Sequence, residues 1–257
     1  MLLAIDAGNT NIVFGLHNGS EWIHEWRFNT LPVKGVMAYA KFLRLNFLEA
    51  DLRFHDVDGI VVSSVVPQLY DVLSTFTRNL IDQEPLFVGP SIYDQLPITT
   101  QNPHEIGTDL VSNAVAAKAL HGGQTIIVDF GTALTFTIVD EEGNIKGVNI
   151  APGLKTAITA LVGQTAQLPE VPLELPDSVI GTNTTMAIQN GVLWGYVSMV
   201  EGMLDKIEKE LGATYKVVAT GGLSSILHPL HDRFDVVDRH LTLEGLRVIH
   251  ETINHEK

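Results

Sequence analysis

The chain has 257 residues, carries 16 Lys and Arg against 30 Asp and Glu for a formal charge of −14, and contains no cysteine. The missing cysteines exclude disulfides, thiol catalysis and thiolate metal sites, and the acidic charge leaves no obvious basic patch for nucleic acid or an anionic membrane. No apolar run reaches membrane-spanning length, and no basic region precedes the aspartate at position 6, so we expect a cytoplasmic protein without nucleic-acid or membrane partners.

The first half of the chain predicts three strands followed by alternating helices and strands. Apolar periodicity gives the order strand, strand, strand, helix, strand, helix, strand over residues 2–5, 12–16, 21–28, 35–50, 60–62, 67–81 and 86–88. Residues 89–108 contain three prolines and little periodicity, which predicts a long irregular loop. Loops of that length inside compact proteins are often functional.

The second half repeats this plan after an alanine-rich helix predicted over 109–120. Strands are expected at 125–129, 133–139, 145–150, 216–219 and 235–237, and helices at 154–162 and 184–211. A proline-rich excursion separates the two helices at 164–182. A further helix is expected between Gly222 and Leu227, and a last one from about Leu243. The chain therefore reads as two related halves.

An aspartate followed by a glycine and a hydroxyl ends a strand in both halves. The copies are Asp6-Ala7-Gly8-Asn9-Thr10 and Asp129-Phe130-Gly131-Thr132. One Asp-x-Gly is equally well an ordinary hairpin turn, but two copies at the same point of a repeated unit favour a shared function. Such turns offer backbone N–H groups to phosphate, whereas the carboxylates would repel it, so the pattern predicts a phosphate chain bound through Mg²⁺.

The order of motifs gives the chain a family resemblance. It resembles the acetate and sugar kinase, Hsp70 and actin superfamily, and within it the type III pantothenate kinases. The resemblance covers essentially the whole chain, and the series of motifs is more specific than any one of them. The motifs are Asp6-x-Gly8-Asn9-Thr10-Asn11, Ser63-Ser64-Val65-Val66-Pro67, Asn102-Pro103, Gly107-x-Asp109, Asp129-x-Gly131-Thr132-Ala133, Ala151-Pro152-Gly153, Gly181-x-Asn183-Thr184 and Ala219-Thr220-Gly221-Gly222-Leu223.

The resemblance implies a fold, an activity and a set of site residues. The fold is α/β, with duplicated ribonuclease H-like β-β-β-α-β-α-β domains, here 1–115 and 116–257, and an interdomain cleft. The activity is ATP-dependent phosphorylation of pantothenate to 4'-phosphopantothenate, the first step of coenzyme A biosynthesis, by a homodimer. The residues implied to bind ATP are Asp6, Ala7, Gly8, Asn9, Thr10, Asn11, Ile12, Val13, Thr132, Gly221 and Gly222. Pantothenate binding falls to Gln101, Gly107, Thr108, Asp109, Leu110 and Thr184.

Three assignments from the same resemblance concern chemistry. Asp109 matches the general base, Asp6 lies at the Mg²⁺, and Asp129 matches the ligand of a monovalent cation, K⁺ or NH₄⁺. From position alone, an N-cap of the alanine-rich helix is the favoured interpretation of Asp109, because aspartate is a preferred cap, and the family motif reverses that preference, although both roles can coexist. Thr184 has the same two interpretations, a helix cap or a ligand contact, and Gly221-Gly222 reads also as a plain strand-to-helix turn.

Two positions depart from the family pattern. Leu110 stands where the family usually has arginine, and the substrate-contacting tyrosine upstream is replaced, with Gln101 as its nearest match. Leucine cannot make the charge-assisted contact of arginine with a carboxylate, and its absence could cost roughly 2–4 kcal/mol of binding. The alternative is therefore a divergent, catalytically weak paralogue that binds nucleotide or phosphorylates another small alcohol.

Overall fold

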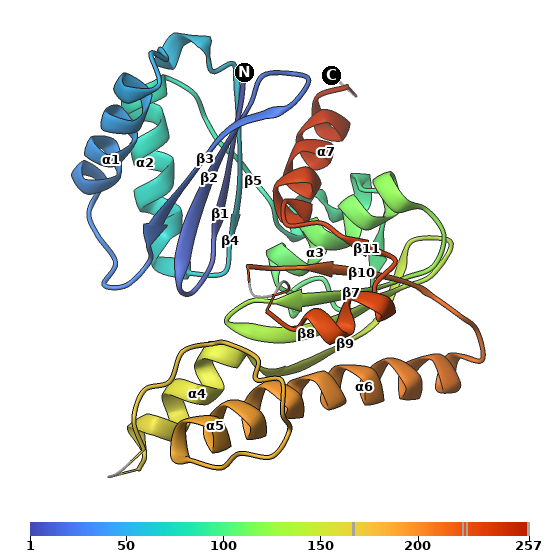
Figure 1. Cartoon of the computed structure of the whole chain (residues 1–257). Coiled ribbons are helices and arrows are strands. Elements are labelled where there is room, and N and C mark those ends of the chain that lie inside the picture. Colours follow the sequence, from blue (N-terminus) through green and yellow to red (C-terminus); the bar gives the residue numbers. More distant parts are fainter. Residues whose placement is uncertain (166–167, 223, 225, 256–257) are drawn as a thin grey trace. The chain divides into compact units, whose positions relative to one another are not determined.

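The computed structural model of the chain describes residues 1–165, 168–222, 224 and 226–255. The chain forms two compact units, unit 1 from Met1–His121 with Leu241–Lys257 and unit 2 from Gly122–His240 (Figure 1). The last helix thus belongs with the first unit, whereas the sequence-based division left it in the second half. The division of the duplicated domains at 115/116 remains a prediction.

Unit 1 is built around a five-stranded sheet. Its strands are β1 (Leu2–Ala7), β2 (Asn11–His17), β3 (Trp22–Asn29), β4 (Gly59–Ser64) and β5 (Leu86–Phe87), in the order β3-β2-β1-β4-β5. The first three strands form an antiparallel meander, and β1 also pairs in parallel with β4. The register sets Asp6 at the end of β1 beside Ser63 of β4.

Two helices cover one face of this sheet. Helices α1 (Val36–Glu49) and α2 (Tyr70–Ile81) lie on the same side of it, with the short turn η2 (Pro67–Leu69) leading into α2 (Figure 1). Their buried side chains, such as Tyr39 and Phe76, pack against alternate residues of β1, β2 and β4. Side chains on a strand point alternately to opposite faces, so the period of two in these strands selects which residues meet the helices.

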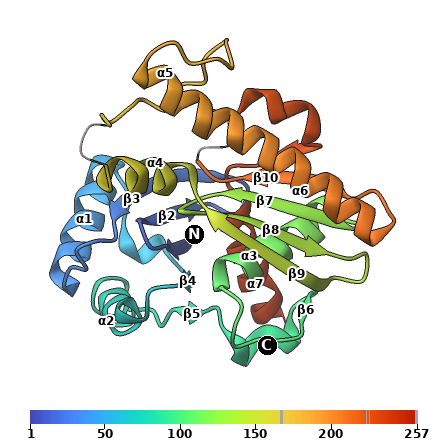
Figure 2. The same cartoon turned by 90° about the horizontal axis from the view of Figure 1, so that it is seen from below.

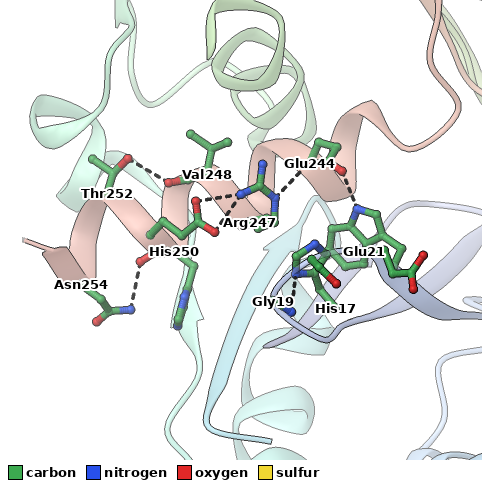
Figure 3. Close-up of polar contacts among 12 residues, drawn as sticks. His17, Gly19, Glu21, Glu244, Arg247, Val248, His250, Thr252 and Asn254 are labelled. Carbon is green, nitrogen blue, oxygen red and sulfur yellow. Dashed lines mark hydrogen bonds and ion pairs between the residues drawn. The ribbon is translucent and has the colours of Figure 1, made fainter. Parts of the chain in front are cut away.

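The other face of the sheet contacts α7 (Leu241–His255), which also packs along α3 (Thr108–Ala116). Within α7, Gly245 lies so close to the backbone of Ser112 that a Cβ atom there would overlap the Ser112 carbonyl. Glu244 accepts a hydrogen bond from the indole N–H of Trp22 at 2.7 Å, and Arg247 bonds Glu244 at 2.9 Å (Figure 3). The C-terminal helix is therefore an integral part of unit 1.

Unit 2 repeats the strand order of unit 1. Its strands are β7 (Thr125–Phe130), β8 (Ala133–Val139), β9 (Asn144–Pro152), β10 (Lys216–Thr220) and β11 (Val236–Val237). Within the unit they follow the order β11-β10-β7-β8-β9, with β7 antiparallel to β8 and parallel to β10. The predicted duplication is confirmed by this identical arrangement around the central strand.

The long helix of unit 2 packs on its sheet, as Figure 2 shows for α6. It is made of α5 (Thr184–Gln189), a π-helical segment η5 (Asn190–Trp194) and α6 (Gly195–Leu211), and α4 (Leu154–Gly163) lies next to η5. Val197, Val200 and Leu204 meet the β7 and β8 side chains in one apolar core. The helix predicted over 184–211 is therefore present, with a π-helical turn that periodicity did not predict.

Three other predictions need correction. The expected irregular loop at 89–108 contains a 3₁₀ helix, η3 (Pro90–Gln95), and a short strand, β6 (Thr99–Thr100). The helix predicted over 109–120 changes to a π-helical segment, η4 (Ala117–His121). The helix expected between Gly222 and Leu227 falls partly on residues outside the described ones, and the regular element that follows is the 3₁₀ helix η6 (His228–Arg233). Among the described residues, no helix is long and apolar enough to cross a membrane.

Candidate active site

The first acidic turn joins β1 to β2 and is held from one side by Thr30. Gly8 donates its N–H to the Asn11 carbonyl at 3.0 Å, which closes the turn. The fully buried Thr30 donates its backbone N–H to the Thr10 carbonyl at 2.9 Å and its hydroxyl to the Gly8 carbonyl at 2.6 Å. These bonds fix the turn, so its tip is preorganised before any ligand binds.

The predicted ATP residues of this turn differ in what they offer to a ligand. Asn9 and Thr10 are exposed, whereas the side chains of Ala7 and Ile12 are fully buried in the core of unit 1. Contacts from Ala7 and Ile12 can therefore come only from their backbone. Glycine at position 8 suits a turn that a phosphate approaches, because it places no side chain there.

A short polar path leads from Asp6 to Asp109 within unit 1. Asp6 pairs with Ser63 in the β1–β4 register, and the Ser63 and Thr108 hydroxyls are 2.9 Å apart in a buried hydrogen bond. Thr108 is the first residue of α3 and Asp109 the second. The structure thus brings Asp6, Ser63, Thr108 and Asp109 to the carboxyl ends of β1 and β4, which is where open α/β sheets bind ligands.

Asp109 does not cap α3. The N-cap is Gly107, and Asp109 lies in the first turn, where its carboxylate accepts the Leu110 backbone N–H at 2.9 Å. A Cβ atom at position 107 would overlap the Asp109 carboxylate. Gly107 is therefore needed to leave room for that carboxylate, and the N-cap interpretation of Asp109 is wrong.

Burial raises the pKa of Asp109, although the backbone N–H groups of Leu110 and of Asp109 itself act in the opposite direction. A base whose pKa approaches the working pH is more effective in proton transfer than an ordinary aspartate. The N-terminus of α3, where Asp109 lies, acts with these N–H groups to favour the ionised carboxylate, the form that can act as a base. The local structure thus suits a carboxylate that accepts a proton.

The two departures from the family pattern lie in different surroundings. Leu110 is 8% exposed and belongs to the apolar core, so no charge occupies the position of the family arginine. Gln101 is exposed. Neither side chain offers a cation, and a carboxylate on the substrate would need a donor from elsewhere.

The second acidic turn, in unit 2, is held by the segment after β9. Gly153 donates its N–H to the Thr132 carbonyl at 3.0 Å, and the Thr156 hydroxyl donates to the same carbonyl at 2.7 Å. A Cβ atom at Gly153 would overlap the carbonyls of Gly131 and Thr132. The Ala-Pro-Gly motif therefore serves to support this turn, as Thr30 supports the first.

Asp129 and the paired glycines after β10 lie together in unit 2. Thr220 of β10 and Thr135 of β8 flank Asp129 in the register of the sheet. Gly221 has a φ of +90°, and a Cβ atom there would lie 2.7 Å from the Asp129 carboxylate oxygen and from the Phe130 backbone. Only glycine fits this position without strain, so Gly221 is more than a generic turn residue.

Thr184 is not a helix cap. The N-cap of α5 is Asn183, whose side chain accepts the Met186 backbone N–H at 2.9 Å. Thr184 is the first helical residue, and it is exposed. The cap interpretation is therefore wrong, and its hydroxyl is accessible to a ligand.

The donor set suits cations that keep most of their water. The described residues contain no group of three or more His, Cys, Asp or Glu that could enclose a metal ion. Mg²⁺ is commonly bound by one or two carboxylates together with substrate phosphates, and a single carboxylate such as Asp6 fits that pattern. A fully protein-made cage would not be expected for it.

Sequence reasoning missed two supporting residues and one tyrosine. Thr30, directly after β3, and Thr156, in α4, support turns that are distant from them in sequence. Only their similar position, after the third strand of each half, hints at this role. Tyr93, on η3, is buried near Asp109 and lies in the segment predicted to be irregular. Its neighbours in sequence, Ile92 and Asp94, gave no signal that its hydroxyl matters.

Comparison with known proteins points to one family. The family model described as type III pantothenate kinase matches residues 2–206. Two relatives of that description, from Moorella thermoacetica and an Exiguobacterium species, are 41% and 40% identical over 98% of this chain and 99% and 98% of their own length. A solved putative 2-dehydro-3-deoxygalactonokinase from Sinorhizobium meliloti superposes with a TM-score of 0.58 at 10% identity, covering 99% of this chain and 96% of its own. That likeness supports the acetate and sugar kinase, Hsp70 and actin fold.

Proposed function

The chain belongs to the type III pantothenate kinase family, and from this membership we propose how its own residues divide the work of phosphorylating pantothenate with ATP. The reaction is the first step of coenzyme A biosynthesis, and the protein is a phosphotransferase acting on an alcohol. Both substrates are metabolites of the cytoplasm, where we place the enzyme. The observation that carries the assignment is that Asp6, Ser63, Thr108 and Asp109 lie together at the carboxyl ends of β1 and β4.

Asp109 orients the hydroxyl of pantothenate and accepts its proton. Phosphoryl transfer has a loose transition state, so the proton leaves late and much of the contribution of the base is positioning. The pKa of Asp109, raised by burial, allows it to accept that proton more readily than an ordinary aspartate. Gly107 leaves the space that this carboxylate occupies, and the hydrogen bond between the Ser63 and Thr108 hydroxyls holds the first residue of α3 against β4.

The two acidic turns bind ATP. Residues 6–13 and Thr132 face the phosphates, and Gly221 and Gly222 lie on the adenosine side. The sequence contains no P-loop lysine, so backbone amides and the cation must balance the phosphate charge. Mg²⁺ at Asp6 supplies charge neutralisation and orientation of the phosphate oxygens when it is bound.

Asp129 binds the monovalent cation. Asp129→Asn is expected to abolish the difference in rate between K⁺ and Na⁺ buffers, because the amide removes the negative charge that holds the cation. Initial rates with ATP, Mg²⁺ and pantothenate would be measured over a K⁺ titration at constant ionic strength. The exposed Glu142→Gln variant is the control and should keep the K⁺ response of the wild type. A K⁺ response retained in Asp129→Asn would show that the cation binds elsewhere.

Pantothenate contacts come from Gly107, Thr108, Asp109 and Thr184, with Leu110 and Gln101 in the positions where relatives bear an arginine and a tyrosine. Leu110 gives an apolar contact only. The carboxylate of pantothenate is then less strongly held here than by an arginine, which predicts a higher Michaelis constant without a loss of the chemical step.

The enzyme acts as a homodimer through unit 2. Apolar side chains are exposed there on β9, on α4 and in the segment before α5, and exposed apolar patches commonly mark interfaces. These side chains are Ile150, Leu161, Val179 and Ile180.

Ile180→Glu is expected to shift the enzyme from dimer to monomer, because it would bury a charge in the interface. Sedimentation velocity over a concentration series measures the change. Leu48→Glu on α1 of unit 1 is the matched control, since both residues are 77% exposed in the structure. A wild-type monomer, or two variants that both remain dimers, would contradict this interface.

A further inference from the structure

Tyr93 has a buried hydroxyl that no described residue binds. The residue lies on η3 and is 6% exposed, and its hydroxyl oxygen has no hydrogen-bond partner among the residues that the structure describes. Burying a hydroxyl without a partner is costly, and most such groups in native proteins are satisfied. A buried hydroxyl without a partner, close to an active site, is therefore a candidate for a hydrogen bond to a ligand.

The surroundings of Tyr93 place it beside the candidate base. Burial raises the pKa of Tyr93 to about 12, and the proximity of Tyr70 and Asp109 adds to this effect. Its phenol therefore stays protonated at physiological pH and can only be a neutral donor or acceptor. The neighbouring Tyr70 differs, because its hydroxyl donates to the Ser64 carbonyl at 3.1 Å and is already satisfied.

These elements converge at the carboxyl end of β4. Tyr70 begins α2, Asp109 is the second residue of α3, and Ser63 and Ser64 end β4. The Val88 N–H donates to the Val62 carbonyl at 2.8 Å, so the chain enters η3, which carries Tyr93, from this same end of β4, and these residues form one cluster in unit 1. Within this cluster, Asp109 already accepts a backbone N–H from Leu110. Leu110, which takes the place of the family arginine, offers no side-chain donor. The hydroxyl of Tyr93 is thus a donor in a cluster that is otherwise rich in acceptors.

We propose that Tyr93 is a substrate-binding residue that donates its hydroxyl hydrogen bond to an oxygen in the half of pantothenate that carries the reacting hydroxyl. The inference rests on the proposed function, because it takes Asp109 as the residue that holds that hydroxyl. The reacting end of pantothenate also bears a second hydroxyl and an amide carbonyl, and both accept hydrogen bonds. The carboxylate is at the opposite end of the molecule, away from the group that Asp109 holds.

Tyr93→Phe tests this inference because it removes one oxygen and keeps the ring. The Michaelis constant for pantothenate is expected to rise roughly tenfold, the value for the loss of a hydrogen bond to a bound substrate, with the constant for ATP unchanged. The melting temperature should not fall, since the hydroxyl has no partner among the described residues of the free protein. Tyr70→Phe is the matched control, and it should lower the melting temperature while leaving both Michaelis constants near wild type.

A second substrate, pantothenol, identifies which part of pantothenate Tyr93 contacts. In pantothenol an alcohol replaces the carboxylate, and the reacting half is unchanged. Tyr93→Phe is expected to raise the Michaelis constant by the same factor for pantothenate and for pantothenol. A penalty that disappears with pantothenol, or a rise in the constant for ATP instead, would overturn the proposal.

The failure of this inference is distinguishable from failure of the proposed function. Unchanged kinetics in Tyr93→Phe, together with an inactive Asp109→Asn, would reject only the role of Tyr93. Full activity in Asp109→Asn would reject the assignment of the base, and with it the premise for Tyr93.

Discussion

Asp109→Asn is expected to lower kcat by about 10²- to 10⁴-fold, the range for loss of a general base, with little change in the binding of ATP. The amide can still accept a hydrogen bond from the substrate, but it cannot accept the proton. The rate of phosphopantothenate formation in the presence of ATP and Mg²⁺ measures the effect. The exposed Asp94→Asn is the control and should keep the wild-type kcat.

The same variant should be at least as stable as the wild type. Burial raises the pKa of Asp109, so the folded protein prefers the neutral carboxyl, and the stability that this provides is lost as the pH rises through the folded pKa. At neutral pH the ionised carboxylate therefore costs stability, and an asparagine removes that cost. Thermal melting at neutral pH should show an equal or higher midpoint in Asp109→Asn.

The pH dependence of the wild type provides an independent check. Because Asp109 must be ionised to act as a base, kcat/KM should fall with decreasing pH at a value above the ordinary aspartate pKa of about 4. A wild-type kcat in Asp109→Asn would contradict the assignment, as would an acid limb that remains unchanged in that variant.

Gly245→Ala is expected to destabilise the enzyme by at least about 3 kcal/mol or to prevent folding. The added Cβ atom would overlap the Ser112 carbonyl, and neither backbone can move away without separating α7 from α3. Urea denaturation followed by circular dichroism gives the midpoint and the free energy of unfolding. The expected result is a lower midpoint, with an unchanged slope of the unfolding free energy against urea concentration.

Gly202→Ala is the matched control for this prediction. Gly202 also lies within a helix, α6, and a Cβ atom there would meet no described atom within 4 Å. Alanine is favoured over glycine in helices by about 1 kcal/mol, so this variant should be slightly more stable. Equal stability of the two variants would show that α7 and α3 do not approach each other as described.

The duplicated fold could be predicted because its signals are local. Alternating and helical apolar patterns gave most strands and helices, and the Asp-x-Gly turn recurs at the same position of each half. The family resemblance implied the duplicated β-β-β-α-β-α-β order of elements along the chain, and the order of the strands within each sheet came from the structure. Periodicity cannot show π-helical turns, so the interruption at Asn190 was missed.

The site was only partly predictable because its supports are non-local. Asp6 and Asp109 were found from motifs, but the hydroxyl pair that connects them joins Ser63 and Thr108, residues 45 positions apart. Thr30 is an ordinary threonine in sequence and acts through two bonds that only the folded turn creates. Capping preferences suggested Asp109 and Thr184 as the N-caps of α3 and α5. The N-caps are instead Gly107 and Asn183, which lie just upstream.

The return of α7 to unit 1 has a consequence for biosynthesis. Residues 241–255 are synthesised after the whole of unit 2, so the sheet formed by the first ninety or so residues must wait, with one face uncovered, until unit 2 has been translated. A nascent chain halted at His121 would expose the apolar surface that α7 later covers and would be a target for chaperones. Trimming the carboxyl terminus should therefore harm the amino-terminal half of the enzyme more than the half that directly precedes the cut.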